Sequence, residues 1–471
     1  MTSVAHELGM PMGEGDLSIE AHGMEPIPTS ARYGSVGRVF TVWFTPNLVP
    51  AGFAIGTLAA ADFLKVGFLT GLAAIIVGNV VGSLLVAMLA QMGPATGMAQ
   101  MPLARLPFGK SIALPGLLNW LSCIGWDGIN SIFGATAITV LIPGIPFPVA
   151  LLAIVLAQGL LGVVGYEGIH MFERYGAIVL GIMFAVLTVV IAGKASTGLA
   201  RVDGMTGLDQ LGAFILFSSI TASFVLAWAL YASDYTRYLP ADTSRSKVFW
   251  WTLLGLTLSA GWIELLGLLV ADQAKGTAVD TINGLLGGGL LGAVAMIAIV
   301  LGTIAVNAMN DYTGSLSLQA AGFKVKRVYA AVVVAVLGFA FTLYLNSGDF
   351  SLKFENYLLF ISYWIAPWAA VVLVDWALRG RRADTSRLIA FGSLPSGGLA
   401  LVALLVGFVV SLPFQTSAFG GDIATATGLP INSIAANYLH FADLAYLVGF
   451  VVAGVIYWAA ARSSVGREAA A

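Results

Sequence analysis

A tryptophan and three polar or polarisable side chains share one face of a predicted helix around residue 126. In the run NWLSCIGWDGINS, Cys123, Trp126, Asp127 and Asn130 are spaced by three or four positions, so they lie on the same helical face. An indole ring beside a carboxylate and an amide suits a flat heterocycle, because stacking and in-plane hydrogen bonds can act together. The alternative is a polar contact between helices, with Trp126 as packing and Asp127 as a structural carboxylate.

A second polar stripe lies in the apolar run around residue 307. Thr303, Asn307, Asn310 and Asp311 fall on one side of a helix there. Two amides and a carboxylate in one membrane-spanning helix are costly unless they face a cavity lined by protein. This stripe therefore indicates a pathway or a site rather than simple helix packing.

The composition places both stripes in a membrane protein. Of 471 residues, 58% are hydrophobic and 10% are charged, with a mean hydropathy of +0.91, whereas a soluble domain is about 25% charged. So few charged side chains cannot cover a water-exposed surface, which excludes a mainly soluble enzyme and makes the lipid bilayer the expected partner. The net charge of -2 gives no argument for binding nucleic acid, and the single cysteine, Cys123, excludes an internal disulfide framework.

Apolar runs long enough to span a bilayer recur along the whole sequence. A spanning helix needs about 20 mainly apolar residues. We predict an all-α polytopic membrane protein with twelve transmembrane helices, at residues 39–60, 66–91, 112–142, 149–166, 175–194, 207–232, 248–271, 290–318, 328–346, 356–378, 395–414 and 438–461. The first 37 residues are polar, and we expect no cleavable signal peptide in them.

The basic residues predict the orientation of these helices. Seventeen of the 22 lysines and arginines fall on connections that lie on the same side as the N-terminus. Basic residues near helix ends remain on the cytoplasmic side. We therefore expect cytoplasmic tails at residues 1–37 and 462–471, in a protein of the plasma membrane.

Helix-breaking residues indicate discontinuous helices. Pro46 and Pro50 lie inside the first run, where proline removes backbone donors and frees carbonyls. The sixth run is rich in serine and threonine up to Ser223 but has no proline, so a break there is less clearly marked. Helices one and six, and three and eight, are five apart, which fits two inverted five-helix repeats. The expected organisation is a ten-helix core at 38–380 and two additional helices at 381–461.

Several motifs in order along the chain resemble the nucleobase cation symporter family, and most of all its purine-cytosine permease branch. The resemblance covers residues 25 to 380 and rests on the segments GMEPIPTSARYGS, TLAAADF, MPLARLPFG, CIGWDGIN, LYASDYTRYLP, NAMNDYTGSLSLQ and ENYLLFISYWIAPWAAVVLVDW. It implies the leucine-transporter-type fold of two inverted five-helix repeats, alternating access, and a substrate held between helices one, three, six and eight.

The resemblance also implies a set of substrate-binding positions. Trp126 is expected to stack on the substrate beside Asp127, and Phe224 is favoured over Val225 as a second aromatic on helix six because only Phe224 can sandwich a ring. The other positions that the resemblance places around the substrate are Leu48, Cys123, Asn130, Ser223 and Asn310.

The sequence departs from the sodium-coupled members of this family. The resemblance places their sodium ion against freed backbone carbonyls of helix one, which correspond here to Phe44 and Asn47. On helix eight it implies one backbone carbonyl, here that of Ala305, and two side chains with hydroxyl groups. Those two positions are occupied by Ala308 and Met309. A hard cation needs oxygen ligands, and neither side chain supplies one.

Buried carboxylates are the alternative carriers of a coupling ion. Asp127, Asp311 and Glu264 lie within predicted helices, and a carboxylate at membrane depth can bind and release a proton. We therefore expect proton coupling, with Asp127 as the leading carrier because it adjoins Trp126, and sodium coupling as the alternative.

The predicted function is secondary active import of a nucleobase, cytosine or a purine, by cation symport. The alternatives are another small heterocycle, such as allantoin, hydantoin, thiamine or pyridoxine, and, less favoured, a channel. An enzyme would need a paired nucleophile and base or a metal cluster, and no such group stands out in the sequence. No cofactor, no metal and no obligatory protein partner is expected.

Overall fold

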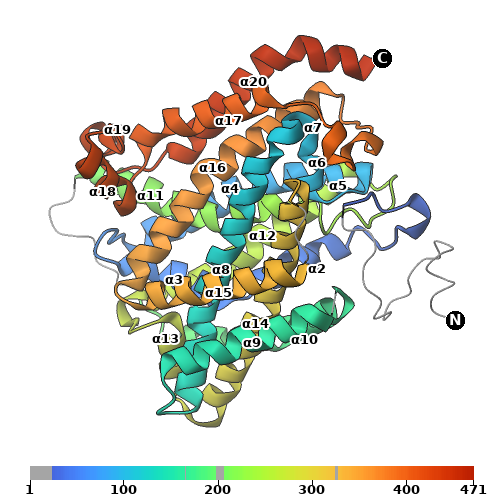
Figure 1. Ribbon diagram of the computed structural model, residues 1–471. Helices are drawn as coiled ribbons and strands as arrows, with labels where there is room; N and C mark the ends of the chain where they lie inside the picture. The colour runs from blue at the N-terminus through green and yellow to red at the C-terminus, as the bar shows by residue number, and fades with distance from the viewer. Residues whose placement is uncertain (1–23, 165, 198–205, 324–326, 471) are drawn as a thin grey trace, which may run out of the picture.

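The computed structural model describes residues 24–164, 166–197, 206–323 and 327–470, and the regular structure of that part of the chain is helical (Figure 1). This confirms the all-α prediction. Most of the predicted N-terminal tail lies outside the described residues.

The helices of the first half alternate between long apolar segments and short pieces. In chain order they are α2 (Arg38–Phe44), α3 (Pro50–Thr57), α4 (Phe68–Ala90), α5 (Met92–Thr96), α6 (Gln100–Leu103), α7 (Arg105–Phe108), α8 (Ala113–Leu141), α9 (Phe147–Val164) and α10 (Tyr166–Ala192).

The second half continues in the same way and ends in a long helix. Its helices are α11 (Gly207–Leu226), α12 (Arg245–Leu268), α13 (Ala278–Leu285), α14 (Gly289–Ala320), α15 (Arg327–Asn346), α16 (Phe350–Leu378), α17 (Gly398–Ser411), α18 (Ala418–Thr427), α19 (Ser433–Tyr438) and α20 (Ala445–Ala470).

Among the described residues, six helices are long and apolar enough to cross a membrane, namely α4, α11, α12, α14, α16 and α20. Two bent pairs, α2 with α3 and α17 with α18, raise the number to eight if each pair is one span. The helix α8 is not among the six, because its tryptophan, aspartate and asparagine residues lower its mean hydropathy.

The first helix is broken where its prolines predict. Helix α2 ends at Phe44, a 3-10 turn covers Thr45–Asn47, Val49 is extended, and α3 begins at Pro50. The two halves are bent by 61°. Proline at the first position of α3 is well tolerated, because that residue's N–H would have no helical partner.

The sixth helix also changes its winding, although it has no proline. Helix α11 ends at Leu226 and passes into a 3-10 helix, η5, at Ala227–Tyr231. The changes of winding in the first and sixth helices face the same pocket, as described below.

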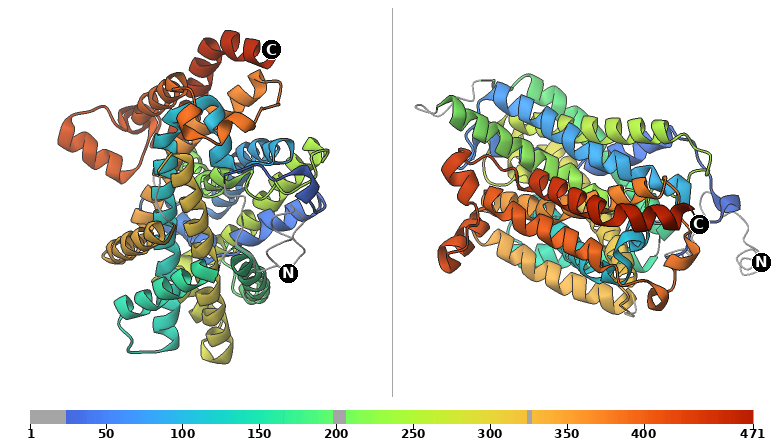
Figure 2. Two further views of the ribbon diagram at one scale, coloured as in Figure 1. Left: turned by 45° about the vertical axis from the view of Figure 1, so that its right-hand side comes forward. Right: turned by 90° about the horizontal axis from the view of Figure 1, so that it is seen from above.

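Small residues bring neighbouring helices into close contact. The pair α8 and α14 makes the most extensive contact, followed by α4 and α11 (Figure 2). A side chain at Gly78 or Gly82 would collide with α11 at Thr221 or Ala222, and one at Gly134 would meet Thr303 of α14. Such close approach is typical of helix packing in membranes, where van der Waals contact drives association.

The two C-terminal helices α17 and α20 pack against each other and against α16 along one side of the molecule (Figure 1). Buried Asp443, just before α20, fixes this side. It accepts hydrogen bonds from Tyr363 Oη of α16 and from the backbone N–H of Thr416, the latter at 2.9 Å. The backbone carbonyl of Asp443 accepts from Ser219 Oγ of α11 at 2.8 Å.

Buried Arg105 connects the segment between α4 and α8 to the C-terminal end of α14. Its guanidinium donates to the carbonyls of Gln319 and Ala320, both at 3.0 Å, and to that of Leu388 at 2.6 Å. Burial lowers the pKa of Arg105 to about 10, so the group remains charged at neutral pH. A cation at a helix C-terminus is stabilised by the exposed carbonyls and the helix dipole.

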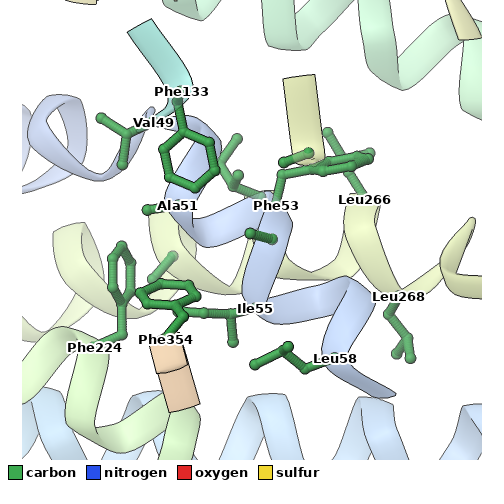
Figure 3. Close-up of a cluster of buried hydrophobic side chains, with 14 of the residues drawn as sticks. Val49, Ala51, Phe53, Ile55, Leu58, Phe133, Phe224, Leu266, Leu268 and Phe354 are labelled. Carbon is green, nitrogen blue, oxygen red and sulfur yellow. The ribbon is translucent and has the colours of Figure 1, made fainter. Parts of the chain in front are cut away.

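Helix α3 is enclosed by apolar side chains from several helices. Figure 3 shows Phe53 and Ile55 of α3, and Leu58 directly after it, within a cluster that also contains Leu266 of α12 and Phe224 of α11. Phe133 of α8 and Phe354 of α16 belong to the same cluster. This packing holds the half-helix after the break in place.

Candidate functional site

A pocket lies between the broken first helix, η5, α8 and α14. Its empty space, including the open mouth, is about 400 Å³. It is lined by Pro46, Val49, Trp126, Asn130, Phe224, Ala227, Trp228, Tyr231, Val306 and Asn310.

Aromatic rings form much of the pocket wall. The ring of Trp126 meets Phe224 at a centroid distance of 5.9 Å and an interplanar angle of 62°. On another side Tyr357 packs edge-on against Trp126 at 5.4 Å and 90°. Both neighbours hold the indole in place by edge contacts. A flat ligand can therefore stack in the pocket against a fixed indole.

Two amides supply the polar groups of the pocket. The side chain of Asn130 lines it and makes no hydrogen bond to another described residue. Asn310 is engaged at both ends, because its Nδ2 donates to Asp127 Oδ1 at 3.1 Å and its Oδ1 accepts from Tyr231 Oη at 3.5 Å. An amide presents a donor and an acceptor side by side, which matches the polar edge of many heterocycles.

Two carboxyl groups meet directly behind Asn310. Asp127 is 2% exposed and its side chain contacts that of Asp311 across the α8–α14 interface. Oδ2 of Asp127 and Oδ1 of Asp311 have no donor among the described residues. Nε2 of Gln158, on α9, donates to the other oxygen of Asp311, Oδ2, at 3.5 Å. The pair therefore has two free acceptor oxygens in a buried position.

Asn307 closes the network on the α9 side. Its Nδ2 donates to Gln158 Oε1 at 2.9 Å and to Ser131 Oγ at 3.0 Å. The amide thus joins α8, α9 and α14. Both polar stripes seen in the sequence face each other in this interface.

The structure brings together four of the residues predicted to bind substrate: Trp126, Asn130, Phe224 and Asn310 all line the pocket. Cys123 is fully buried one layer behind it, with its Sγ 3.3 Å from Tyr231 Oη. Asp127 reaches the pocket only through Asn310.

Three other predicted positions do not line the pocket. Leu48 is directed toward Gly181 of α10, and Val49 lines the pocket. Neither residue has helical backbone angles, so helical spacing does not decide which of the two side chains faces the pocket. Val225 packs against Gly82 of α4. The hydroxyl of Ser223 donates back to the carbonyl of Ser219 at 2.6 Å.

The side chains at the two positions on helix one whose carbonyls were predicted to bind sodium make other contacts. The backbone carbonyl of Asn47 accepts from the N–H of Val49 at 2.9 Å. The ring of Phe44 stacks on Trp262 at 6.2 Å and 27°. The side chain of Asn47 donates to the carbonyl of Trp43 at 2.9 Å and accepts from Trp228 Nε1 at 3.0 Å. This amide stabilises the break, because it occupies a carbonyl that the interrupted helix leaves free.

The corresponding positions on α14 are apolar. Buried Ala308 and Met309 pack with Trp228 and Tyr235. At Ala305, where the backbone carbonyl was the predicted ligand, the methyl group lies near Gly176 of α10. Among the described residues there is also no group of three His, Cys, Asp or Glu that could hold a metal ion.

Glu264, the third predicted proton carrier, lies elsewhere. It is fully buried on α12, where Asn79 of α4 donates to its Oε2 at 2.5 Å. Its Oε1 and the Oδ1 of Asn79 have no partner in the described part of the chain. Glu264 is not a lining residue of the pocket.

Trp228 and Tyr231 were missed by the sequence analysis. They line the pocket from η5. Their spacing of four and seven positions from Phe224 is the signal that could have identified them, because such residues share one helical face.

Comparisons with known proteins show the family of the chain and its fold. A family model described as "Permease for cytosine/purines, uracil, thiamine, allantoin" matches residues 26–449. The chain is 28% identical over 451 residues to the purine-cytosine permease fcyB of Emericella nidulans, covering 88% of this chain and 86% of the relative. It is 29% identical over 441 residues to a purine-cytosine permease of Saccharomyces cerevisiae, covering 88% and 82% respectively.

The fold is similar to that of a solved transporter. A nucleobase-cation-symport-1 family transporter in a closed conformation with bromovinylhydantoin bound superposes with a TM-score of 0.73 at 17% identity, covering 96% of this chain and 97% of the other. The inward-facing conformation of the same transporter gives a TM-score of 0.70. At this identity, the likeness concerns the fold.

Proposed function

The chain belongs to the nucleobase cation symporter family, the permeases for cytosine, purines, uracil, thiamine and allantoin, and on that premise we propose that it imports cytosine or a purine together with a proton. It is a polytopic membrane transporter that moves nucleobases by secondary active symport. The proposal adds the base, the coupling ion and the residues that bind them.

The pocket at Trp126 is the observation that carries the choice of substrate. A base would stack on the indole between the helix breaks, with Phe224 at its edge. The amides of Asn130 and Asn310 can each offer a donor and an acceptor to its polar edge. Asparagine forms paired hydrogen bonds of this kind with adenine. Aromatic walls with a few polar groups are typical of sites for flat ligands.

The contact between Asp127 and Asp311 supports proton coupling. Two ionised carboxylates in contact repel each other, and a proton on one of them removes that repulsion. Each group here has an oxygen without a donor among the described residues. Asp127 is the proposed carrier, because Asn310 connects it to the pocket. Sodium is the weaker candidate, because Ala308 and Met309 offer no oxygen and are buried among aromatic side chains.

We also propose twelve transmembrane spans, with a ten-helix core at 38–380 and two additional helices at 381–461. The six long helices, the two bent pairs, the shorter apolar helices in α9, α10 and α15, and α8 support this count. The excess of basic residues on one side supports cytoplasmic termini in the plasma membrane.

Uptake of radiolabelled cytosine into cells that lack their own nucleobase carriers tests the proposal. We expect saturable uptake that unlabelled adenine, guanine or hypoxanthine inhibits, that rises with an inward pH gradient and that does not require sodium. Trp126→Ala should strongly reduce uptake at low substrate concentration, while Trp250→Ala, at an exposed position on α12, should not.

Other results of the uptake experiment would change the proposed substrate or the proposed coupling ion. Inhibition by allantoin, hydantoin, thiamine or pyridoxine, with no cytosine uptake, would assign the pocket to another heterocycle. Uptake that depends on sodium and ignores the pH gradient would contradict proton coupling.

A further inference from the structure

We propose that Asn310 couples substrate binding to proton binding, because its single amide is shared between the pocket and the carboxyl group of Asp127. This inference rests on the proposed function and assigns its coupling step to one side chain. Asn310 acts as a positioning residue for the proton and as a contact for the substrate.

The amide of Asn310 is engaged at both of its ends in the empty site. It lines the pocket and is 5% exposed. Its Nδ2 donates to Asp127 Oδ1 at 3.1 Å, and its Oδ1 accepts from Tyr231 Oη at 3.5 Å. A base that turns this amide toward the pocket competes with Asp127, with Tyr231 or with both.

The hydrogen bond from Asn310 matters to Asp127 because Asp127 has few others. Within the described chain, Asn310 is the one neutral donor to its side chain, and Oδ2 has none. A buried carboxylate that loses its donor is strongly disfavoured. A base that draws the amide away thus favours the protonated Asp127–Asp311 pair.

The surroundings of Asp127 give no other way to balance its charge. The titratable groups facing it are Asp311 from α14, Cys123 from its own helix, Tyr231 from η5 and Tyr357 from α16. From α9 the neighbouring network presents the neutral side chain of Gln158, and from α15 the glycine Gly338. No described lysine, arginine or histidine contacts the pair. Charge balance therefore depends on a proton.

Coupling of this kind is reciprocal. If the bound base favours the proton, then the proton favours the base by the same factor. Symport follows, because the two are carried together and neither binds as well alone. The substrate class is a heterocycle with a polar edge that an amide can satisfy.

Affinity measured against pH on the purified, full-length transporter tests this step. We expect the Kd of radiolabelled cytosine, with adenine as a second probe, to fall as the pH falls, by up to about tenfold per pH unit for one coupled proton. Asp127→Asn should bind with no pH slope. Asn310→Ala should bind more weakly and also lose the slope, whereas an amide that only shaped the pocket would leave the slope unchanged.

Glu264→Gln provides the matched control. It neutralises a carboxyl group that is equally buried and also held by an asparagine, but that does not contact the pocket. Its Kd should follow the wild-type pH slope.

A second measurement needs no ligand, in case Asn310→Ala binds too weakly to titrate. The infrared absorption of protonated carboxyl groups is followed against pH in the empty protein. Without the amide donor, the band of the Asp127–Asp311 pair should persist to higher pH in Asn310→Ala than in the wild type. In Asp127→Asn the contribution of Asp127 to this band should be absent.

The outcomes separate the two proposals. A wild-type protein that binds neither cytosine nor adenine overturns the proposed function. A wild type that binds them while Asn310→Ala keeps both the wild-type slope and the wild-type infrared titration overturns the coupling role alone. Equal loss of slope in Glu264→Gln would also overturn it, because the slope would then not belong to the pair at the pocket.

Discussion

Two buried carboxyl sites in this transporter resemble each other in chemistry and differ in their connection to the pocket. Asp127 accepts from the amide of Asn310, and Glu264 accepts from the amide of Asn79. Neither of these acids has a basic partner among the described residues. The amide of Asn310 faces the pocket, whereas Asn79 is fully buried and donates in addition to the carbonyl of Ile75. Burial and an amide donor are therefore common to both sites, and the difference between them is that Asn310 connects its carboxyl group to the pocket.

The surroundings of Glu264 indicate a structural role. Its backbone carbonyl lies so close to Gly56 of α3 that a side chain at Gly56 would collide with it. Gly267, one turn further along α12, makes a similarly close approach to the backbone of Phe53. Glu264 and Asn79 thus lie where α3, α4 and α12 meet, at a point where the helices are closely packed.

The largest effect expected is on accumulation. Asp127→Asn should abolish concentrative uptake driven by a pH gradient without sodium, because one proton per substrate supports about tenfold accumulation for each pH unit. Glu264→Gln should retain it. Accumulation of labelled base in membrane vesicles with an imposed gradient measures both. The reverse pattern, with Glu264→Gln inactive and Asp127→Asn normal, would exchange the roles of the two sites.

The next effect is on affinity. Trp126→Ala should weaken binding by about 1–3 kcal/mol, the range found for stacking of a base on an aromatic ring, or roughly 5- to 150-fold. Its pH slope should remain, because the link from Asn310 to Asp127 is intact. Competition binding on the purified protein provides the measurement. A change smaller than twofold would mean that the indole is packing and not a substrate contact.

The third effect expected is on the stability of the fold, which should depend on Glu264. Glu264→Ala leaves the amide of Asn79 without its acceptor and opens a gap between α4 and α12, so we expect a loss of about 1–3 kcal/mol. Glu264→Gln keeps an acceptor and should lose less. Thermal unfolding of the two variants in the same detergent makes the comparison. Equal unfolding temperatures for wild type and Glu264→Ala would contradict the structural role.

The smallest effect expected is from Tyr231→Phe. Its hydroxyl approaches Asn310 Oδ1 at 3.5 Å, which is long for a hydrogen bond. Removing it should change the affinity by less than about tenfold, consistent with about 0.5–1.5 kcal/mol for one hydrogen bond, and should leave the pH slope in place. Loss of the slope in this variant would shift the coupling role from the Asp127 end of the amide to its Tyr231 end.

The sequence predicted the parts of the site that follow a regular helical period. Trp126 and Asn130 share the face expected from their spacing, and Asn310 lies on the predicted stripe of α14. The break at Pro46 and Pro50 was also predicted, because proline acts locally on the backbone.

The rest depends on features that periodicity does not encode. Val49 replaces Leu48 in the pocket wall, because the register of side chains after an unwound stretch depends on the backbone angles of that stretch. Trp228 and Tyr231 lie in η5, where the helix changes its winding without a proline in the sequence to indicate it. The contact of Asp127 with Asp311 joins two helices far apart in sequence, so only the packing of α8 on α14 reveals it.

The central claim is that substrate and proton meet through Asn310 at Asp127, and proton uptake on substrate binding measures it most directly. Cytosine is added to the purified transporter in weakly buffered solution with a pH-sensitive dye. The account predicts net proton uptake by the wild type and by Glu264→Gln, and none by Asp127→Asn, with uptake lost in Asn310→Ala at saturating cytosine. Binding without proton uptake in the wild type, or uptake that persists in Asp127→Asn and disappears in Glu264→Gln, would contradict it.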